Sequence, residues 1–278
     1  MPVEEQFLSH WNNILQKVRV ATGTNADLAR RVQARYEQFV NALQFPTDAN
    51  QEPADAVRQL NEYDDFSKTV EAENSFFNWR SNFAASVIPE FFYRYAVSRF
   101  DRLGVAAFFS TKDSVVEATF SVNEAGAMHV RHKDQDLCVG VRKETLVCSG
   151  KTLVFVAPAV CCEVKTNIDI NKLNGLDFSA ERLKRSFPGA RYFLITETID
   201  FSLNNNYAAG FIDEVFVLRK QVRSVARRTK EPLCPDVFKA TCDTIVETVI
   251  LASRAAGHVY ERLPAGKLIQ FEPKRPKP

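Results

Sequence analysis

With 278 residues, 45% of them hydrophobic, the chain has the size and composition of a soluble globular protein with one large domain or two small ones. Its 36 basic residues nearly balance 34 acidic ones, and the formal net charge of +2 excludes a protein that binds nucleic acid through overall charge. DNA binding would need basic residues gathered on one face. The polar first residues and the lack of a long apolar run predict no signal peptide and no membrane span, and cysteines without CxxC spacing indicate a reducing cytoplasm.

The first third of the chain is predicted to be helical. Apolar residues at helical spacing predict two helices between residues 4 and 44, and residues 54–79 read as a further helix. Another apolar helix follows over residues 86–95. It carries a single acid, Glu90, just after Pro89, where the helix dipole favours a carboxylate. Residues 114–122 then alternate between apolar and polar side chains, which predicts a strand.

Two apolar strands are predicted next, over residues 137–141 and 151–165. A turn at Ser149-Gly150 allows them to pair as antiparallel neighbours. The second strand is a Val-rich run typical of a strand buried on both faces, and Pro158 predicts a bulge within it. The six cysteines lie mostly in these strands and lack CxxC spacing, so we expect buried, reduced thiols and no zinc site.

Charged side chains stand at the ends of these two strands. Glu163 and Lys165 are two residues apart and project to the same side of their strand, while Asp136 opens the neighbouring strand. An ion pair at a strand end would explain Glu163 and Lys165 alone. Together with Asp136, or with its competitor Asp134, they predict a Mg²⁺-dependent phosphodiesterase: carboxylates hold the metal, and the lysine orients water or stabilises charge on phosphorus.

The rest of the chain supplies candidate DNA contacts. A polar loop over residues 167–175 precedes a helix over 176–187, a strand over 190–198 and a second polar loop over 202–207. Residues 215–218 close the sheet, a basic stretch follows, and a helix from Pro235 to about Ala256 precedes a tail over 273–278 that we expect to be disordered. The candidate DNA contacts in these segments are Asn167, Lys172, Asn204, Asn205, Asn206, Arg219 and Arg223. An ordinary polar loop and an exposed linker remain the alternatives for these stretches.

Asp136 followed by Glu163-x-Lys165 on the next strand resembles the PD-(D/E)XK nuclease superfamily. The stretches EVKTNID from Glu163, FLITET at 193–198 and DEVFVLR at 213–219 resemble type II restriction endonucleases of the BbvCI-like group, which recognise sites related to CCTNAGC. The resemblance implies an α/β (α+β) fold: a restriction-endonuclease-like core of a central mixed β-sheet flanked by helices. It also implies that Glu90, on the helix before the sheet, adds a metal ligand. No proline precedes Asp136, which departs from the family pattern.

We expect an N-terminal helical region at 1–82, a nuclease core at 83–232 and a C-terminal helix and basic tail at 233–278. The sequence leaves open whether the helical region is an appended subdomain or the outer layer of one domain. The resemblance implies a bacterial enzyme that cuts double-stranded DNA with Mg²⁺, as a homodimer or as a heterodimer with a related subunit. A repair or recombination nuclease of the same fold is the nearest alternative. A DNA-binding protein that has lost cleavage is another, although Asp136, Glu163 and Lys165 argue against it.

Overall fold

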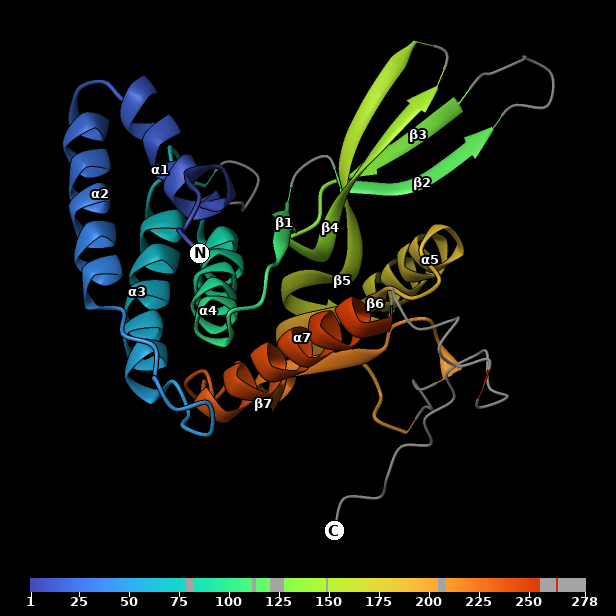
Figure 1. Ribbon diagram of the computed structural model, residues 1–278. Helices are drawn as coiled ribbons and strands as arrows, with labels where there is room; N and C mark the ends of the chain where they lie inside the picture. The colour runs from blue at the N-terminus through green and yellow to red at the C-terminus, as the bar shows by residue number, and fades with distance from the viewer. Residues whose placement is uncertain are drawn as a thin grey trace.

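The computed structural model describes residues 1–78, 83–111, 114–120, 128–148, 150–204, 209–255 and 264 (Figure 1). The expected tail over 273–278 lies outside these residues. No helix among them is both long and apolar enough to cross a membrane.

The predicted N-terminal helices are present. A 3₁₀ turn, η1 (Glu5–Phe7), leads into α1 (Ser9–Val20), α2 (Thr24–Ala42) and α3 (Ala54–Glu73), which lie together on one side of the molecule in Figure 1. Their contact is made by side chains at helical spacing, and Ile14, Val32, Leu60 and Tyr63 are almost fully buried. A second 3₁₀ turn, η3 (Ala84–Ser86), precedes α4 (Val87–Leu103), which is buried along most of its length.

A five-stranded mixed sheet forms the centre of the fold, in the order β1-β4-β5-β6-β7. Its strands are β1 (Phe108–Ser110), β4 (Leu137–Cys148), β5 (Lys151–Asp169), β6 (Arg191–Asp200) and β7 (Glu214–Val222). The predicted antiparallel pairing of β4 with β5 is confirmed, and β5, β6 and β7 run parallel. A parallel pair needs a crossover, and α5 (Ile170–Ser186) supplies it between β5 and β6.

The predicted irregularity at Pro158 is also present. The register of β4 and β5 shifts on both sides of the pair formed by Gly140 and Pro158. A Cβ atom at position 140 would lie 2.1 Å from the carbonyl oxygen of Ala157, so only glycine fits where the two backbones approach here. Beyond the bulge the two strands leave the body of the sheet and project as a hairpin, beside the two-stranded sheet of β2 (Ser114–Phe120) and β3 (Met128–Lys133) (Figure 1).

The predicted polar loop over 167–175 is wrong. Strand β5 continues to Asp169, and α5 begins at the next residue because the Asp169 side chain accepts a hydrogen bond from the Lys172 backbone N–H, 2.9 Å away. An aspartate at this position is a favourable N-cap, which ends the strand and starts the helix without an intervening loop.

Helices cover both faces of the sheet. On one face α4 and α7 (Pro235–Ala255) share a hydrophobic cluster with Cys162, Val164 and Ile195 of the strands. On the other face α5 packs through Ala180 and Leu183 against Cys161 and Tyr192. The first cluster also includes residues of α1, α2 and α3, so the N-terminal helices form an outer layer on the same core. The division of the chain at residues 82 and 232 stays a proposal.

Candidate active site

Asp136, Glu163 and Lys165 come together where β4 begins. Glu163 and Lys165 alternate along β5 with Cys162 and Val164, which face the main core, and therefore lie on the α5 side of the sheet. The Lys165 Nζ atom is 2.8 Å from Glu163 Oε2 and 3.2 Å from Asp136 Oδ2. Asp136 Oδ2 also accepts a hydrogen bond of 2.7 Å from the Val164 backbone N–H, which fixes this carboxylate to β5.

Burial and neighbouring charges set the ionisation of these groups. Burial raises the pKa of Asp136 and the Glu163 carboxylate adds to that effect, while Lys165 opposes it. Burial also acts to raise the pKa of Glu163, but the ammonium groups of Lys165 and Lys133 outweigh it, and the pKa is lowered. Partial burial acts to lower the pKa of Lys165, but the carboxylates of Asp136 and Glu163 outweigh it and the pKa is raised, so Lys165 is protonated at neutral pH in this arrangement.

Two further side chains belong to this cluster and were missed in the sequence. Lys133, the last residue of β3, places its Nζ atom 2.5 Å from Glu163 Oε1 and 3.2 Å from the Tyr192 hydroxyl. That buried hydroxyl donates to Glu163 Oε1 at 3.4 Å. Sequence periodicity offers no signal for Lys133, because the position of β3 relative to β5 follows from tertiary packing alone.

The donor set fits a hard divalent cation that keeps much of its hydration. Asp136 and Glu163 present carboxylate oxygens within 3.2 Å of one nitrogen atom. Within the described residues, no group of three or more His, Cys, Asp or Glu side chains has the arrangement of a metal site. Two carboxylates with water and phosphate as the remaining ligands are typical of Mg²⁺, whereas zinc and calcium take fuller protein shells.

The structure does not bring Glu90 to this cluster. Its carboxylate is buried among the N-terminal helices, where Oε2 accepts hydrogen bonds of 2.9 Å from the backbone N–H groups of His10 and Trp11. Its other oxygen, Oε1, accepts from the Tyr36 hydroxyl and from Arg94 Nε. Glu90 therefore caps the first turn of α1 from a neighbouring helix and forms a buried ion pair, so its expected role as a metal ligand is wrong.

Glu90→Gln should lower the free energy of unfolding by about 3 kcal/mol, since the change leaves Arg94, whose side chain is only 13% exposed, without its counterion. The cleavage rate per folded molecule should stay within about twofold of wild type, because Glu90 does not touch the carboxylate pair. Urea denaturation and active-site titration measure the two quantities separately. A normal unfolding curve with lost activity would restore Glu90 to the active site.

His10 makes the stability of this helical layer depend on pH. Its ring is fully buried, with Nδ1 3.0 Å from the Phe83 carbonyl and Nε2 2.8 Å from the Tyr63 hydroxyl, and burial lowers the pKa of His10 from 6.5 to about 4. Below pH 6.5 His10 becomes protonated in the unfolded chain, whereas in the folded protein it stays neutral until about pH 4. Stability should therefore fall by about 3 kcal/mol from this group as the pH drops through that window. Unfolding free energies of wild type and His10→Gln should differ in slope there, and parallel slopes would refute the assignment.

The candidate DNA contacts divide into exposed and buried residues. Asn167 lies near the end of β5, where its Oδ1 accepts a hydrogen bond of 3.0 Å from Thr198, and Lys172 is exposed in the first turn of α5. Asn204 is exposed, whereas Asn205 and Asn206 lie outside the described residues. Arg223 is partly exposed and is 3.2 Å from Asp200.

Arg219 is the exception, because it is buried and serves the fold. On β7, its guanidinium group pairs with Glu197 at 2.8 Å and lies 3.6 Å from Asp64 of α3. Lys68 completes the group, 2.7 Å from Asp64 and 2.5 Å from Glu197. This network ties α3 to the sheet on the face away from α5, and the prediction that Arg219 contacts DNA is wrong.

Arg219→Met should lower the free energy of unfolding by about 3–5 kcal/mol, because two acids lose a buried partner. Arg223→Met is the matched control. Its exposed ion pair with Asp200 should contribute less than about 1 kcal/mol. Chemical denaturation of both variants measures the difference, and equal stability would show that the buried network does not hold α3 in place.

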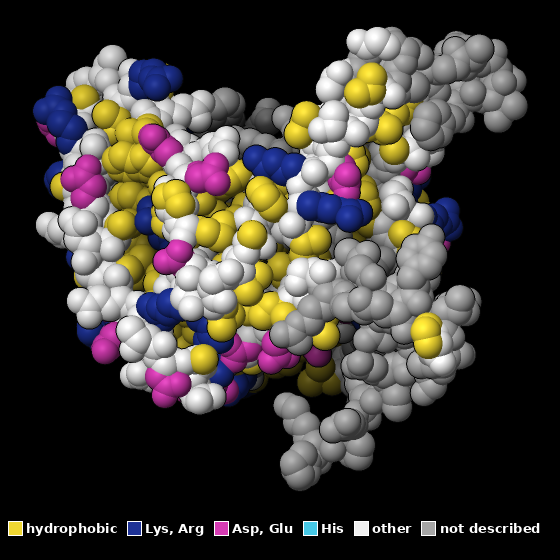
Figure 2. Space-filling model, in the orientation of Figure 1, with side chains coloured by type: hydrophobic (Ala, Val, Ile, Leu, Met, Phe, Trp, Pro, Cys, Tyr) yellow, Lys and Arg dark blue, Asp and Glu magenta, His cyan; other side chains and the backbone are white. Residues whose placement is uncertain are grey.

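The described surface carries mixed charge. On the face seen in Figure 2, the described lysines and arginines are interspersed with acidic residues instead of forming one continuous patch. The expected concentration of basic residues is therefore not found on this face. Several members of the predicted basic stretch, which begins within β7, are paired with acids, such as Lys220 with Asp236 and Lys230 with Asp65.

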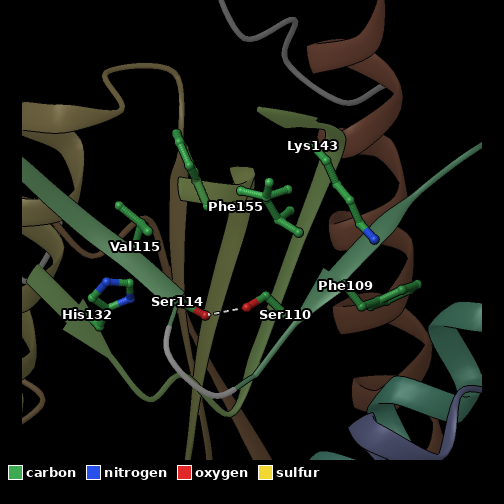
Figure 3. A pocket seen from close by; sticks show the side chains of 9 residues that line it. Phe109, Ser110, Ser114, Val115, His132, Lys143 and Phe155 are labelled. Carbon is green, nitrogen blue, oxygen red and sulfur yellow. Dashed lines mark hydrogen bonds between the residues drawn. The ribbon is translucent and has the colours of Figure 1, made fainter. Parts of the chain in front are cut away.

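A pocket of about 290 Å³ lies where the projecting hairpins leave the sheet (Figure 3). It is lined by residues of β1, β2, β3, β4 and β5, and the hydroxyl groups of Ser110 and Ser114 lie 2.9 Å apart on one side of it. His132 and Lys143 lie on opposite sides of it (Figure 3). None of Asp136, Glu163 and Lys165 lines this pocket, so it is separate from the carboxylate cluster.

Comparison with known proteins gives two matches. The sequence model of the Bpu10I restriction endonuclease family matches residues 85–231, just over half of the chain, and this region contains the whole carboxylate cluster. A solved structure, the native BbvCI A2B2 tetramer, is similar over 93% of this chain and 100% of the other, with 37% sequence identity and a TM-score of 0.67. No curated protein matches the chain.

Proposed function

The chain belongs to the Bpu10I restriction endonuclease family and is a type II restriction enzyme of the BbvCI-like group; we propose that it is a subunit making Mg²⁺-dependent hydrolytic cuts in double-stranded DNA at a short specific sequence. The observation that carries the proposal is the convergence of Asp136, Glu163 and Lys165 where β4 begins, on the α5 side of the sheet. The presence of all three residues argues against a DNA-binding protein that has lost cleavage.

Each residue has a role that its environment supports. Asp136 and Glu163 would hold the cation, and the lowered pKa of Glu163 keeps its carboxylate ionised. When bound, Mg²⁺ neutralises phosphate charge and makes a water molecule more acidic. Lys165 donates hydrogen bonds to both carboxylates and, as a fixed positive charge, stabilises the negative charge that develops on the phosphoryl oxygens. Because these side chains are already in position before the reaction, less free energy is needed to orient them in the transition state.

Cleavage of both DNA strands sets the number of chains in the assembly. A carboxylate cluster of this kind cuts one strand, so a double-strand break requires two chains. The similar BbvCI structure contains two kinds of subunit. This favours a pair of related but different subunits over a homodimer, and such a pair can read an asymmetric DNA site.

Plasmid digestion tests the proposal. The purified protein, alone and with a co-expressed related subunit, should cut supercoiled plasmid at defined sites in Mg²⁺ and leave it intact in EDTA. Sequencing of the product ends would give the recognition site. Specific binding without cleavage in Mg²⁺ would support the non-catalytic alternative, and cleavage at DNA structures regardless of sequence would support a repair nuclease.

A further inference from the structure

We propose that Lys133 is a second active-site lysine, which binds Glu163 when the cation is absent and a DNA phosphate beside the cut when the cation is bound. The inference deepens the proposed function and rests on it. Its basis is the 2.5 Å contact between Lys133 Nζ and Glu163 Oε1, made by a residue of β3 that belongs to a different sheet from Glu163.

Glu163 cannot keep both of its lysines and also bind a cation. One oxygen contacts Lys133 and the other contacts Lys165, so both are occupied by ammonium groups. A cation that takes one of these oxygens displaces an ammonium group, because like charges repel at this distance. Lys165 has a second carboxylate partner in Asp136, whereas the carboxylate partner of Lys133 is Glu163. Lys133 would therefore lose one ion pair on leaving the site, whereas Lys165 would lose two.

The surroundings of Lys133 give it a route to the substrate. Its side chain is 32% exposed, against 6% for Glu163, so it approaches the acid from the solvent side. The buried Tyr192 hydroxyl, 3.2 Å from Lys133 Nζ, supports the side chain near its present position after Glu163 is released. Along β3, the exposed Arg131 and His129 share its face and lead outward, although Glu117 lies opposite Arg131 in the strand pair.

The charges of the site also support this role. Asp136, Glu163, Lys165 and Lys133 sum to zero, so a bound divalent cation leaves a net charge of +2. Attack of hydroxide on the singly charged phosphodiester forms a transition state with two negative charges, which this set balances. Without Lys133 the set would have a net charge of only +1.

The salt dependence of DNA binding tests the exchange. Binding of the complete assembly to a duplex that carries the mapped site should be measured in Ca²⁺ and in EDTA over a range of KCl concentrations. In Ca²⁺, Lys133→Met should reduce the slope of log affinity against log salt by about 0.9, the value for one lost phosphate contact. In EDTA the slopes of wild type and variant should agree, because Lys133 then binds Glu163. Lys133→Arg should restore the Ca²⁺ slope, and Lys239→Met, on α7, should change neither.

Each other outcome overturns the proposal. An unchanged slope in Ca²⁺ would make Lys133 a structural counterion of Glu163, even if the variant were less active or less stable. A slope reduced equally in Ca²⁺ and EDTA would show a DNA contact that does not depend on the cation. Failure of the proposed function is distinguishable, since the wild-type assembly would then leave plasmid uncut in Mg²⁺ whatever residue 133 contributes.

Discussion

Lys165→Ala should lower the single-turnover rate of DNA cleavage about a thousandfold, while DNA affinity in Ca²⁺ stays within about threefold of wild type. Lys165 lies between the two carboxylates, where its charge acts on the reacting phosphate more than on the rest of the duplex. Rapid-quench cleavage in Mg²⁺ and fluorescence anisotropy in Ca²⁺ measure the two effects separately.

Lys239→Ala is the control for this prediction, because Lys239 pairs with Asp243 on α7, away from the cluster. It should cut DNA at the wild-type rate. Loss of DNA affinity in Lys165→Ala comparable to the loss of rate would assign Lys165 to binding, and an unchanged cleavage rate would remove it from the active site.

The second large effect is expected from Glu163→Gln, made in this chain while a different partner subunit stays intact. The complex should nick one defined strand and convert supercoiled plasmid to open circle with almost no linear product. The amide keeps the size of the side chain but removes a charge that two lysines and a cation depend on. Gel electrophoresis and sequencing of the nicked strand would read this result.

The same change distinguishes the two assemblies. If the enzyme is a homodimer, every active site carries the variant and both cuts should be lost. Glu62→Gln, on the surface of α3, should leave double-strand cleavage unchanged. Linear product from an assembly in which every copy carries Glu163→Gln would contradict the assignment of Glu163.

The part of the site that the sequence predicted depends on local rules. The alternation of side chains along a strand put Glu163 and Lys165 on one side, and the short hairpin between β4 and β5 fixed the position of Asp136 opposite them. Asp134 is exposed in the segment between β3 and β4, whereas Asp136 contacts Val164 and Lys165. These residues lie close together in one antiparallel strand pair, so the alternation of side chains along the strands was enough to place them.

The errors have a common physical cause in partners that are distant along the chain. Glu90 accepts hydrogen bonds from the backbone of the first turn of α1, some 80 residues earlier in the chain, and Arg219 pairs with Asp64 across the core. Neither contact leaves a periodic signal, and an acid on an apolar helix or a base in a charged stretch reads the same whether it binds a ligand or a buried partner. Lys133 was missed for the same reason, because its contact with Glu163 depends on how β3 packs against the main sheet.

The most direct test of the account is the position of the cation itself. A crystal of the assembly with its DNA site and Mn²⁺, prepared with Lys165→Ala to slow cleavage, would give an anomalous difference map at the manganese edge. The peak should lie within bonding distance of carboxylate oxygens of Asp136 and Glu163, beside the phosphate to be cut. A peak held by other residues, or a cleavage site bound without a peak at this pair, would contradict it.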